Sequence, residues 1–410
     1  MQIKKYSFDI FNISFLALLL LSIVLPKCFM KVKFGLLFLC VMRGIMYTVK
    51  NKNYINKYSF LWFFSYFLYF FIWIIIGIWN GNDIEGITSY LKLNCIYTIM
   101  FFFLMNCAEN LKGYETIFKS IVFANFLISL YIILIFMDAV GITNVQFINE
   151  NTYNITSVLN NGYTKIAAPI VFSLIFTIPF VLVYYSQETV RKGIFSFVNI
   201  ASSLMAAVIS GNRMLLLLIM FTTLVCIFMI KKTKKNILFF FIAAGLVLIF
   251  LVRMSFFEGN ISLYSLTERI INEIRFDDEN VRWKQIMELF KGFLEKPIIG
   301  SGFAAGVSGI VRNEQDWLYE VVYMLYLYNT GIIGLIFYLA LIVSVVFMAV
   351  KIKKINRNNK YILPALMGYI CILLACWTNP VLGKFDSLWF LFLIPMYFNN
   401  QLLNRKRICV

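Results

Sequence analysis

Two arginines, Arg213 and Arg282, have the clearest capacity for chemistry in this sequence. Arg213 ends a Ser-Gly-Asn-Arg string at 210–213, directly before a leucine-rich apolar run, and Arg282 lies in the long polar segment 253–316. A planar guanidinium can hold a phosphate or pyrophosphate through two parallel hydrogen bonds. Each arginine is therefore a candidate cation for such a group. For Arg213, a side chain that snorkels to lipid headgroups is an equally weighted interpretation.

Carboxylates near the end of the same segment are the candidates for a general base. The chain has no histidine, which excludes an imidazole base and any histidine-ligated metal. The role of base therefore falls to a carboxylate, first to Asp316 and next to Glu314 or Glu320. A carboxylate at a membrane rim is equally plausible as the ion-pair partner of an arginine. The acids at 277–279 could bind a divalent cation, but a solvated turn with a helix cap is the favoured interpretation.

The rest of the chain predicts a membrane scaffold for these residues. Hydrophobic residues make up 61% of it and charged residues 14%, and apolar runs long enough to cross about 30 Å of hydrocarbon recur throughout. These runs lack the period-two alternation of barrel strands. We therefore predict an all-α, polytopic integral membrane protein with about 12 transmembrane helices and one long external loop that carries amphipathic helices. The expected spans are 8–25, 32–49, 58–78, 91–107, 117–137, 165–185, 194–210, 213–230, 237–252, 317–350, 361–378 and 385–400.

This pattern divides the chain into N-terminal membrane helices at 1–252, an external catalytic loop at 253–316 and C-terminal membrane helices at 317–410. The eight cysteines lie in or beside apolar spans without a CxxC pair. They are expected to be buried hydrophobic residues rather than ligands of a metal or partners in disulfides.

The net charge of +17 is distributed as membrane orientation requires. Lysines and arginines gather in alternate short loops, and placing those loops in the cytoplasm puts both termini inside and the 253–316 loop outside. Lys27, Lys31 and Lys33 are the exception, because this orientation places them outside. The same distribution argues against nucleic acid as a partner.

Two amphipathic helices are expected within the long loop. Ser265 and Glu268 form a capping-box pattern at the start of the first helix, and the second is predicted over 281–291. On the second helix Trp283, Ile286, Met287 and Phe290 form an apolar stripe, with Arg282, Gln285 and Leu289 on another face. We expect both helices to lie along the membrane surface.

Two further polar stretches have open interpretations. The glycine-rich turn at 300–306 is not a dinucleotide fingerprint, because no βαβ unit surrounds it, and a flexible re-entry of the loop towards the membrane is its simplest interpretation. The segment 138–164, rich in Asn and Thr, is a second external loop that suits either solvent or sugar hydroxyls.

The order of these motifs resembles the bacterial O-antigen ligase/polymerase superfamily over roughly residues 200–400. The resemblance depends on the Ser-Gly-Asn-Arg string at 210–213, Arg-Trp at 282–283 before an amphipathic helix, a Pro-x-x-Gly-x-Gly turn at 297–302, an acidic and aromatic stretch at 314–320, Gly-Ile-Ile-Gly at 331–334, and Thr-Asn-Pro at 378–380.

The resemblance implies a glycosyltransferase of the bacterial cytoplasmic membrane. Its substrates would be polyprenyl-pyrophosphate-linked oligosaccharides such as undecaprenyl pyrophosphate derivatives, joined on the outer face into O-antigen, capsule or a related polysaccharide. Ligases of this family typically carry a histidine near the position of Glu314 to Asp316, and its absence favours the Wzy-type polymerase branch. No cofactor is implied, since the substrate arrives activated. Membrane lipids, a chain-length regulator and a flippase are the further partners expected.

The implied chemistry assigns the candidate residues to roles. Arg213 and Arg282 would stabilise charge that develops on the leaving pyrophosphate, and Asp316 would accept the proton of the acceptor hydroxyl. Expected substrate contacts are Arg312, Glu314, Glu320 and Trp283.

Three other classes of protein fit parts of the pattern. A transporter or flippase for lipid-linked oligosaccharide often has about twelve spans, but usually as two similar halves that are not evident here. A non-catalytic protein that binds glycolipid would use the same arginines. A peptidoglycan glycosyltransferase has related chemistry but no motif support. The O-antigen ligase remains the alternative within the resembled superfamily.

Overall fold

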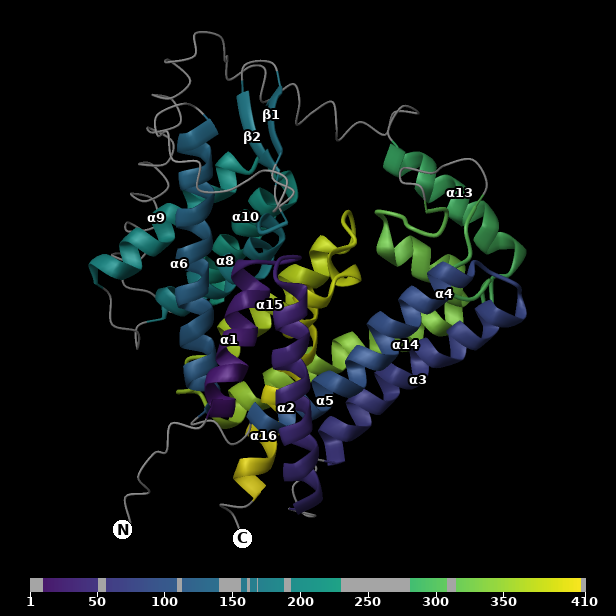
Figure 1. Cartoon of the computed structure of the whole chain (residues 1–410), viewed down its shortest axis with the longest axis horizontal. Coiled ribbons are helices and arrows are strands. Elements are labelled where there is room, and N and C mark those ends of the chain that lie inside the picture. The colour runs from purple at the N-terminus through teal and green to yellow at the C-terminus, as the bar shows by residue number, and fades with distance from the viewer. Residues whose placement is uncertain are drawn as a thin grey trace.

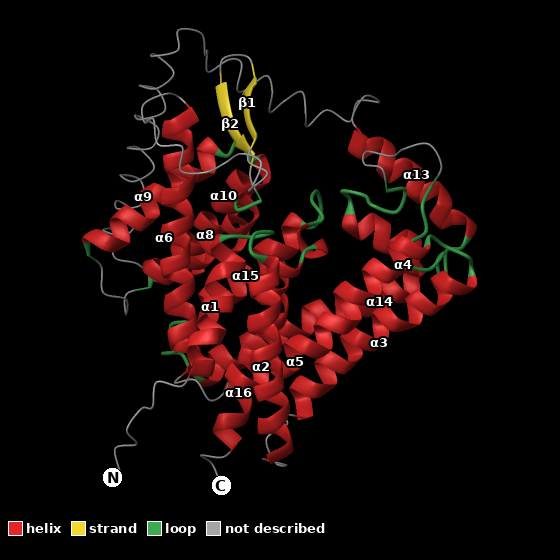
Figure 2. Ribbon diagram, viewed as in Figure 1, coloured by secondary structure: helices red, strands yellow, loops and turns green. Residues whose placement is uncertain are grey.

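Helices make up almost all of the described structure (Figure 2). The computed structural model describes residues 10–50, 57–108, 113–139, 156–160, 163–167, 169–187, 193–229, 281–307 and 315–406. Its helices are α1 (Ile10–Val24), α2 (Met30–Lys50), α3 (Lys57–Trp79), α4 (Ile84–Tyr90), α5 (Tyr97–Ala108), α6 (Gly113–Ala139), α8 (Val171–Ser186), α9 (Ile194–Ile209), α10 (Arg213–Met229), α13 (Val281–Glu295), α14 (Val322–Ile355), α15 (Ile362–Ala375) and α16 (Leu388–Lys406).

Short elements connect some of these helices. A π-helical turn, Leu91–Ile96, joins α4 to α5, and two 3₁₀ turns, Val381–Gly383 and Phe385–Ser387, lie between α15 and α16. Among the described residues, the departure from an all-helical architecture is one antiparallel hairpin of β1 (Thr156–Asn160) and β2 (Tyr163–Ala167).

The helices agree with the apolar spans expected from the sequence. A helix occupies most of every expected span except 237–252, which lies outside the described residues. Four stretches are long and apolar enough to cross a membrane by length and composition, and shorter apolar helices accompany them. The four are Lys57–Trp79, Ile84–Met105, Tyr114–Asp138 and Val322–Ile355. The architecture is that of a helical membrane protein.

Three expected boundaries were wrong. Residues 163–167 form a strand rather than the start of the 165–185 span, so α8 begins only at Val171. The 91–107 span is preceded by α4, whose first turn is capped by the Asp83 carboxylate accepting from the Gly86 N–H (2.6 Å). The 317–350 span begins at Val322 and is broken at Gly331, where the backbone leaves helical geometry.

The helices pack into two sides joined by a central group (Figure 1). The α6, α8, α9 and α10 helices lie on one side, and α3, α4, α13 and α14 lie on the other. The start of α1 and the end of α16 lie at the lower end of this view, whereas the hairpin and α13 lie at the upper end. This arrangement is compatible with both termini on one face of a membrane and the candidate site on the other.

Candidate active site

Arg282 is held by a carboxylate on the chain segment that leads into α14. Its Nε donates to Oε2 of Glu320 at 2.7 Å, and the side chains are 39% and 21% exposed. The pair is therefore partly open to solvent at the edge of the α13–α14 contact. A guanidinium fixed by one carboxylate in this way still has donors directed elsewhere, because it carries five N–H groups.

Gln285 lies three residues after Arg282 on the same face of α13. It binds the segment before α14 that also carries Glu320. Its buried Oε1 accepts from the Glu320 backbone N–H at 3.1 Å, while its Nε2 has no hydrogen-bond partner within the described part of the chain. Unpaired buried donors are uncommon and costly. Gln285 is thus a further candidate for a polar contact at the site, and its i, i+3 spacing from Arg282 was the available sequence signal.

The two predicted faces of α13 are confirmed as distinct faces. Gln285, Leu289 and Phe293 are buried against the protein, whereas Met287 and Phe290 of the apolar stripe are 40% and 42% exposed. Within the predicted apolar stripe, Met287 and Phe290 therefore face outward, whereas Ile286 packs against the buried cluster around Leu289 and Trp283 is half-buried. The first predicted amphipathic helix, starting at Ser265, lies outside the described residues.

The glycine-rich turn is hydrogen-bonded to the broken part of α14. Ser301 and Gly302 donate their N–H groups to the carbonyls of Tyr328 (3.1 Å) and Asn329 (2.8 Å). In return, Ile332 and Ile333 of α14 donate to the carbonyls of Pro297 and Ile298. The break in α14 therefore leaves these backbone groups paired, since the 297–302 segment replaces the lost helical partners.

Gly300 and Gly331 make this close approach sterically feasible. Gly331 has φ 63° and ψ −171°, a conformation that is almost restricted to glycine. A Cβ on Gly331 would lie 2.3 Å from the Ile298 carbonyl oxygen, and one on Gly300 would lie 2.5 Å from the Gly331 nitrogen. The Pro-x-x-Gly-x-Gly and Gly-Ile-Ile-Gly motifs are thus two halves of one backbone contact.

The end of α3 holds the other side of the turn. Trp73 donates its indole N–H to the Ile299 carbonyl at 2.7 Å and accepts from the Phe303 N–H at 3.0 Å. The Asn82 amide donates to the carbonyls of Ser301 (2.9 Å) and Phe303 (3.0 Å). Trp73 and Asn82 were missed at the sequence level, because the contact spans more than two hundred residues. Bonded on both sides, the turn is a fixed re-entry rather than a flexible one.

Asp316 lies beside a tyrosine that closes the loop on itself. The Tyr319 hydroxyl donates to the Asp316 backbone carbonyl (2.8 Å) and accepts from the Val307 N–H (2.8 Å). Asp316 is exposed, so its carboxylate is accessible to an acceptor hydroxyl. Trp283 is half-buried on α13, and Arg312 and Glu314 lie outside the described residues.

Arg213 is presented by a capped helix start on α10. Gly211 takes a φ of 57°, and Asn212 accepts from the Leu215 N–H through Oδ1 at 3.3 Å, as an N-cap does. Ser210 stabilises the turn by donating to the Ala207 carbonyl at 2.7 Å. The Ser-Gly-Asn-Arg string therefore forms a turn and a helix N-cap, which together place the half-buried Arg213 at the N-terminus of α10.

The two arginines belong to different sides of the described structure. The α10 helix packs against α8 and α15, whereas α13 packs against α14, and Figure 1 shows α10 and α13 apart. Arg282 is thus brought together with Glu320 and Gln285, and Arg213 is not among these contacts. Within the described residues no group of three or more Cys, Asp or Glu side chains could hold a metal ion. The acids at 277–279 lie outside the described residues.

Fold and site together define a helical membrane protein with a polar site at one end, built around an arginine–carboxylate pair and a re-entrant turn. Residues 197–339 match the family model Wzy_C, described as O-antigen ligase. The match covers the motifs from Arg213 to Gly331–Gly334, is consistent with the O-antigen ligase/polymerase superfamily, and confirms the resemblance inferred from those motifs. No curated protein matches the chain.

Proposed function

We propose that the protein is a membrane glycosyltransferase that polymerises polyprenyl-pyrophosphate-linked oligosaccharide repeat units on the outer face of the cytoplasmic membrane. The family match supports a membrane enzyme acting on lipid-linked polysaccharide. The observation that carries the proposal is the Arg282–Glu320 pair, which fixes a partly exposed guanidinium at the start of α13. The absence of histidine favours polymerisation over ligation.

In the proposed reaction, a hydroxyl of the acceptor repeat unit attacks the anomeric carbon of the donor chain. The new C–O bond forms as the bond from that carbon to the pyrophosphate oxygen breaks, and the pyrophosphate keeps the electron pair on the departing lipid. The hydroxyl proton passes to the Asp316 carboxylate. Arg282 and Arg213 bind the leaving pyrophosphate more strongly as its charge grows, which lowers the barrier.

The remaining predicted residues have supporting roles in this proposal. Glu320 orients Arg282 through the 2.7 Å ion pair, and Arg213 approaches the pyrophosphate from the α10 side. Trp283, Arg312 and Glu314 contact the saccharide or its phosphates.

The test supplies lipid-pyrophosphate repeat units to the purified full-length protein and separates the products by length. Wild-type protein should give a ladder of repeats, and Arg282→Ala and Arg213→Ala should each lower the rate by about 10²-fold or more, since each removes charge stabilisation in the transition state. Lys284→Ala is the matched control, because Lys284 is an exposed cation on the same helix as Arg282. Single repeats alone from the wild type would contradict polymerisation.

The second candidate function is the O-antigen ligase, the activity printed in the description of the matching family. The products distinguish the ligase from the polymerase. A ligase transfers the saccharide once to a different lipid acceptor and produces no ladder from repeat units alone.

A further inference from the structure

A tryptophan with an open ring lies on the connection between α15 and α16. Trp377 comes two residues after the end of α15 and is 65% exposed, although Cys376 before it and Val381 after it are buried. Its indole N–H has no hydrogen-bond acceptor among the described residues. A tryptophan usually buries its apolar ring and pairs its N–H. An open one is therefore suited to a ligand that offers both an apolar face and a hydrogen-bond acceptor.

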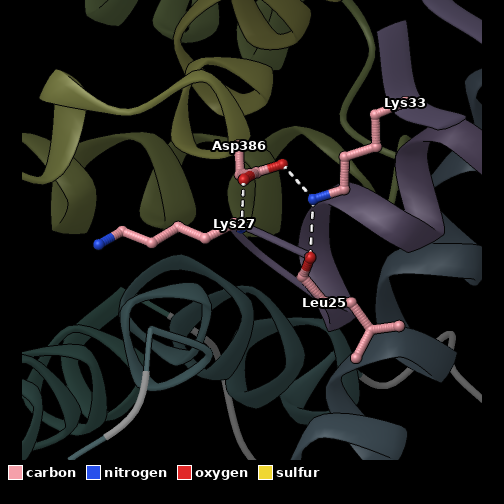
Figure 3. A network of polar contacts seen from close by, with 4 residues as sticks. All are labelled: Leu25, Lys27, Lys33 and Asp386. Atoms are coloured by element: carbon pink, nitrogen blue, oxygen red, sulfur yellow. Dashed lines mark hydrogen bonds and ion pairs between the residues drawn. The ribbon is translucent and has the colours of Figure 1, made fainter. Parts of the chain in front are cut away.

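The connection that carries Trp377 is fixed at both ends. Near α15, the Asn379 N–H donates to the Ala375 carbonyl at 3.0 Å. Near α16, Asp386 accepts from the Lys33 ammonium through Oδ1 and from the Lys27 backbone N–H through Oδ2, both at 2.8 Å (Figure 3). Lys33 is fully buried, and removing either partner of a buried ion pair is strongly destabilising. The connection is therefore a firm support for its side chains.

The first turn of α14 contacts the ring of Trp377. The ring centroid of Tyr323 lies 5.8 Å from that of Trp377, with 44° between the two planes. The Tyr323 hydroxyl donates to the Leu373 carbonyl at 2.7 Å, which fixes the tyrosine ring against the end of α15. Tyr323 thus supports Trp377 from one side, while most of the tryptophan stays exposed.

This contact places Trp377 close to the segment that holds Arg282. Glu320, the ion-pair partner of Arg282, precedes Tyr323 by three residues, and three residues span at most about 11 Å between their Cα atoms. The α15 helix also contacts α10, which begins with Arg213, and Figure 1 shows the α15–α16 connection between α10 and α13. Trp377 is therefore close enough for one oligosaccharide of several sugars to contact both it and Arg282.

Thr378 and Asn379 place polar groups next to the open ring. Both side chains are half-buried, and the Asn379 amide donates to the Thr378 hydroxyl oxygen at 3.2 Å. A sugar ring has a face of C–H bonds, which packs on the negative face of an aromatic ring, and hydroxyls at its edge, which pair with amide and hydroxyl groups. Because none of these three side chains is charged, the group suits a sugar rather than an anion.

We propose that Trp377, Thr378 and Asn379 form a saccharide subsite that holds a sugar ring of the lipid-linked oligosaccharide whose pyrophosphate lies at Arg282. This inference rests on the proposed function, which supplies the oligosaccharide. The bilayer interface is the competing occupant, because exposed tryptophans also mark the ends of membrane helices. Trp79 is a tryptophan of that kind, since it ends the membrane-length helix α3 and is 89% exposed. It is therefore the matched control.

The first test measures binding of the free oligosaccharide to the full-length protein. The probe is released by mild acid from the lipid-linked repeat units of the cells that make the protein, and titration followed by saturation-transfer NMR gives its Kd without turnover. Trp377→Ala should raise the Kd about 10-fold, because the stacking surface is lost, and Trp377→Phe should recover most of the affinity. Asn379→Ala should raise the Kd about threefold or more through lost hydrogen bonds. Trp79→Ala should bind as the wild type does.

A variant of similar bulk separates loss of the ring from loss of packing. Trp377→Leu keeps an apolar side chain without an aromatic face, so it should bind as weakly as Trp377→Ala and melt at the temperature of the wild type. Wild-type affinity in Trp377→Leu or Trp377→Ala would overturn the subsite. Failure of the wild-type protein to bind the free oligosaccharide would overturn it as well.

Fluorescence quenching distinguishes the sugar from the bilayer. The emission of Trp377 is the difference between wild type and Trp377→Phe, and that of Trp79 is the difference between wild type and Trp79→Phe. Both are measured in nanodiscs of phosphatidylcholine with brominated acyl chains. The brominated lipid should quench Trp79 and spare Trp377, and the free oligosaccharide should change the emission of Trp377 alone. Quenching of Trp377 by the brominated lipid would make it a membrane anchor and overturn the proposal.

Activity distinguishes failure of this inference from failure of the proposed function. Trp377→Ala should raise the KM for lipid-pyrophosphate repeat units about 10-fold with little change in kcat, because stacking on a sugar away from the reacting bond is equal in the ground and transition states. A wild-type protein that binds the free oligosaccharide through Trp377 and forms no polymer overturns the proposed function alone. A ladder formed by Trp377→Ala with an unchanged KM overturns the subsite alone.

Discussion

At the scale of residues, the site combines Arg282, which is held by an ion pair with Glu320, and Gln285, whose side-chain nitrogen has no hydrogen-bond partner within the described residues. The Arg282–Glu320 ion pair fixes the guanidinium from one side, and Gln285 positions the Glu320 backbone while its own amide nitrogen has no partner within the described residues. A preorganised cation of this kind stabilises developing charge without reorganising during the reaction. The carboxylate bonded to Arg282 is better suited to positioning than to proton transfer, which leaves Asp316 as the candidate base.

This division of roles predicts different losses from neutralising the two carboxylates. Glu320→Gln should lower kcat/KM roughly tenfold, because the amide keeps one hydrogen bond to Arg282 but loses the charge pairing. Asp316→Asn should cost about 10²-fold or more, as loss of a general base does. Both are measured as initial rates of repeat-unit transfer.

Gln315→Ala is the control for these two variants, since Gln315 is adjacent to Asp316 and its side-chain amide donates to Glu85 at the surface (3.4 Å). A larger loss in Glu320→Gln than in Asp316→Asn would transfer the role of base to Glu320.

At the scale of elements, the broken helix α14 connects the scaffold to the site. Its break at Gly331 is filled by residues 297–302, which α3 holds from the opposite side through Trp73 and Asn82. Phe303 then enters the aromatic core, stacked on Phe70 and Tyr90 with centroids 5.0 and 4.7 Å away. The turn, α3 and α14 therefore form one rigid support beneath α13.

Gly331→Ala should destabilise the protein by about 3 kcal/mol or more. The substitution forces a side chain into a backbone region that costs about 1–3 kcal/mol, and its Cβ would collide with the Ile298 carbonyl at 2.3 Å. The measurement is thermal unfolding in detergent, followed by intrinsic tryptophan fluorescence. Gly35→Ala is the matched control, because a Cβ at helical Gly35 meets nothing within 4 Å and alanine favours the helix. Equal melting temperatures for both variants would contradict the assigned backbone contact.

The sequence predicted most of the helices, because the length of an apolar run and the capping residues at its ends are local features of the chain. Helical periodicity predicted α13, but the expected end at 291 was too early, because the helix continues through Gly292 to Glu295. The sequence did not single out the partner of Arg282, because Glu314, Asp316 and Glu320 were all possible carboxylates. The contacts of Asn82, Lys33 and Asp386 depend on residues far apart in the chain, and no local pattern specifies them.

At the scale of the whole molecule, the described helices place polar chemistry at one end. The hairpin and α13 lie at the upper end of Figure 1, and the ends of α1 and α16 nearest the termini lie at the lower end. Lys33, one of the three lysines that conflicted with the expected orientation, is a buried ion-pair partner rather than a loop charge. The rule that assigns positive loops to the cytoplasm counts loop charges, so this conflict is smaller than the sequence indicated.

The expected orientation places α13 outside the cell and the basic end of α14 inside. Lys291→Cys on α13 and Lys353→Cys near the end of α14 are exposed positions that test the two ends, each in a background with the native cysteines replaced. An impermeant maleimide should label Lys291→Cys in whole cells, and label Lys353→Cys only after the membrane is opened, because the hydrocarbon core excludes the charged reagent. Polymer formation by each variant confirms that the labelled protein is folded. The opposite labelling pattern would invert the molecule and place the candidate site in the cytoplasm, where polymerisation on the outer face is impossible.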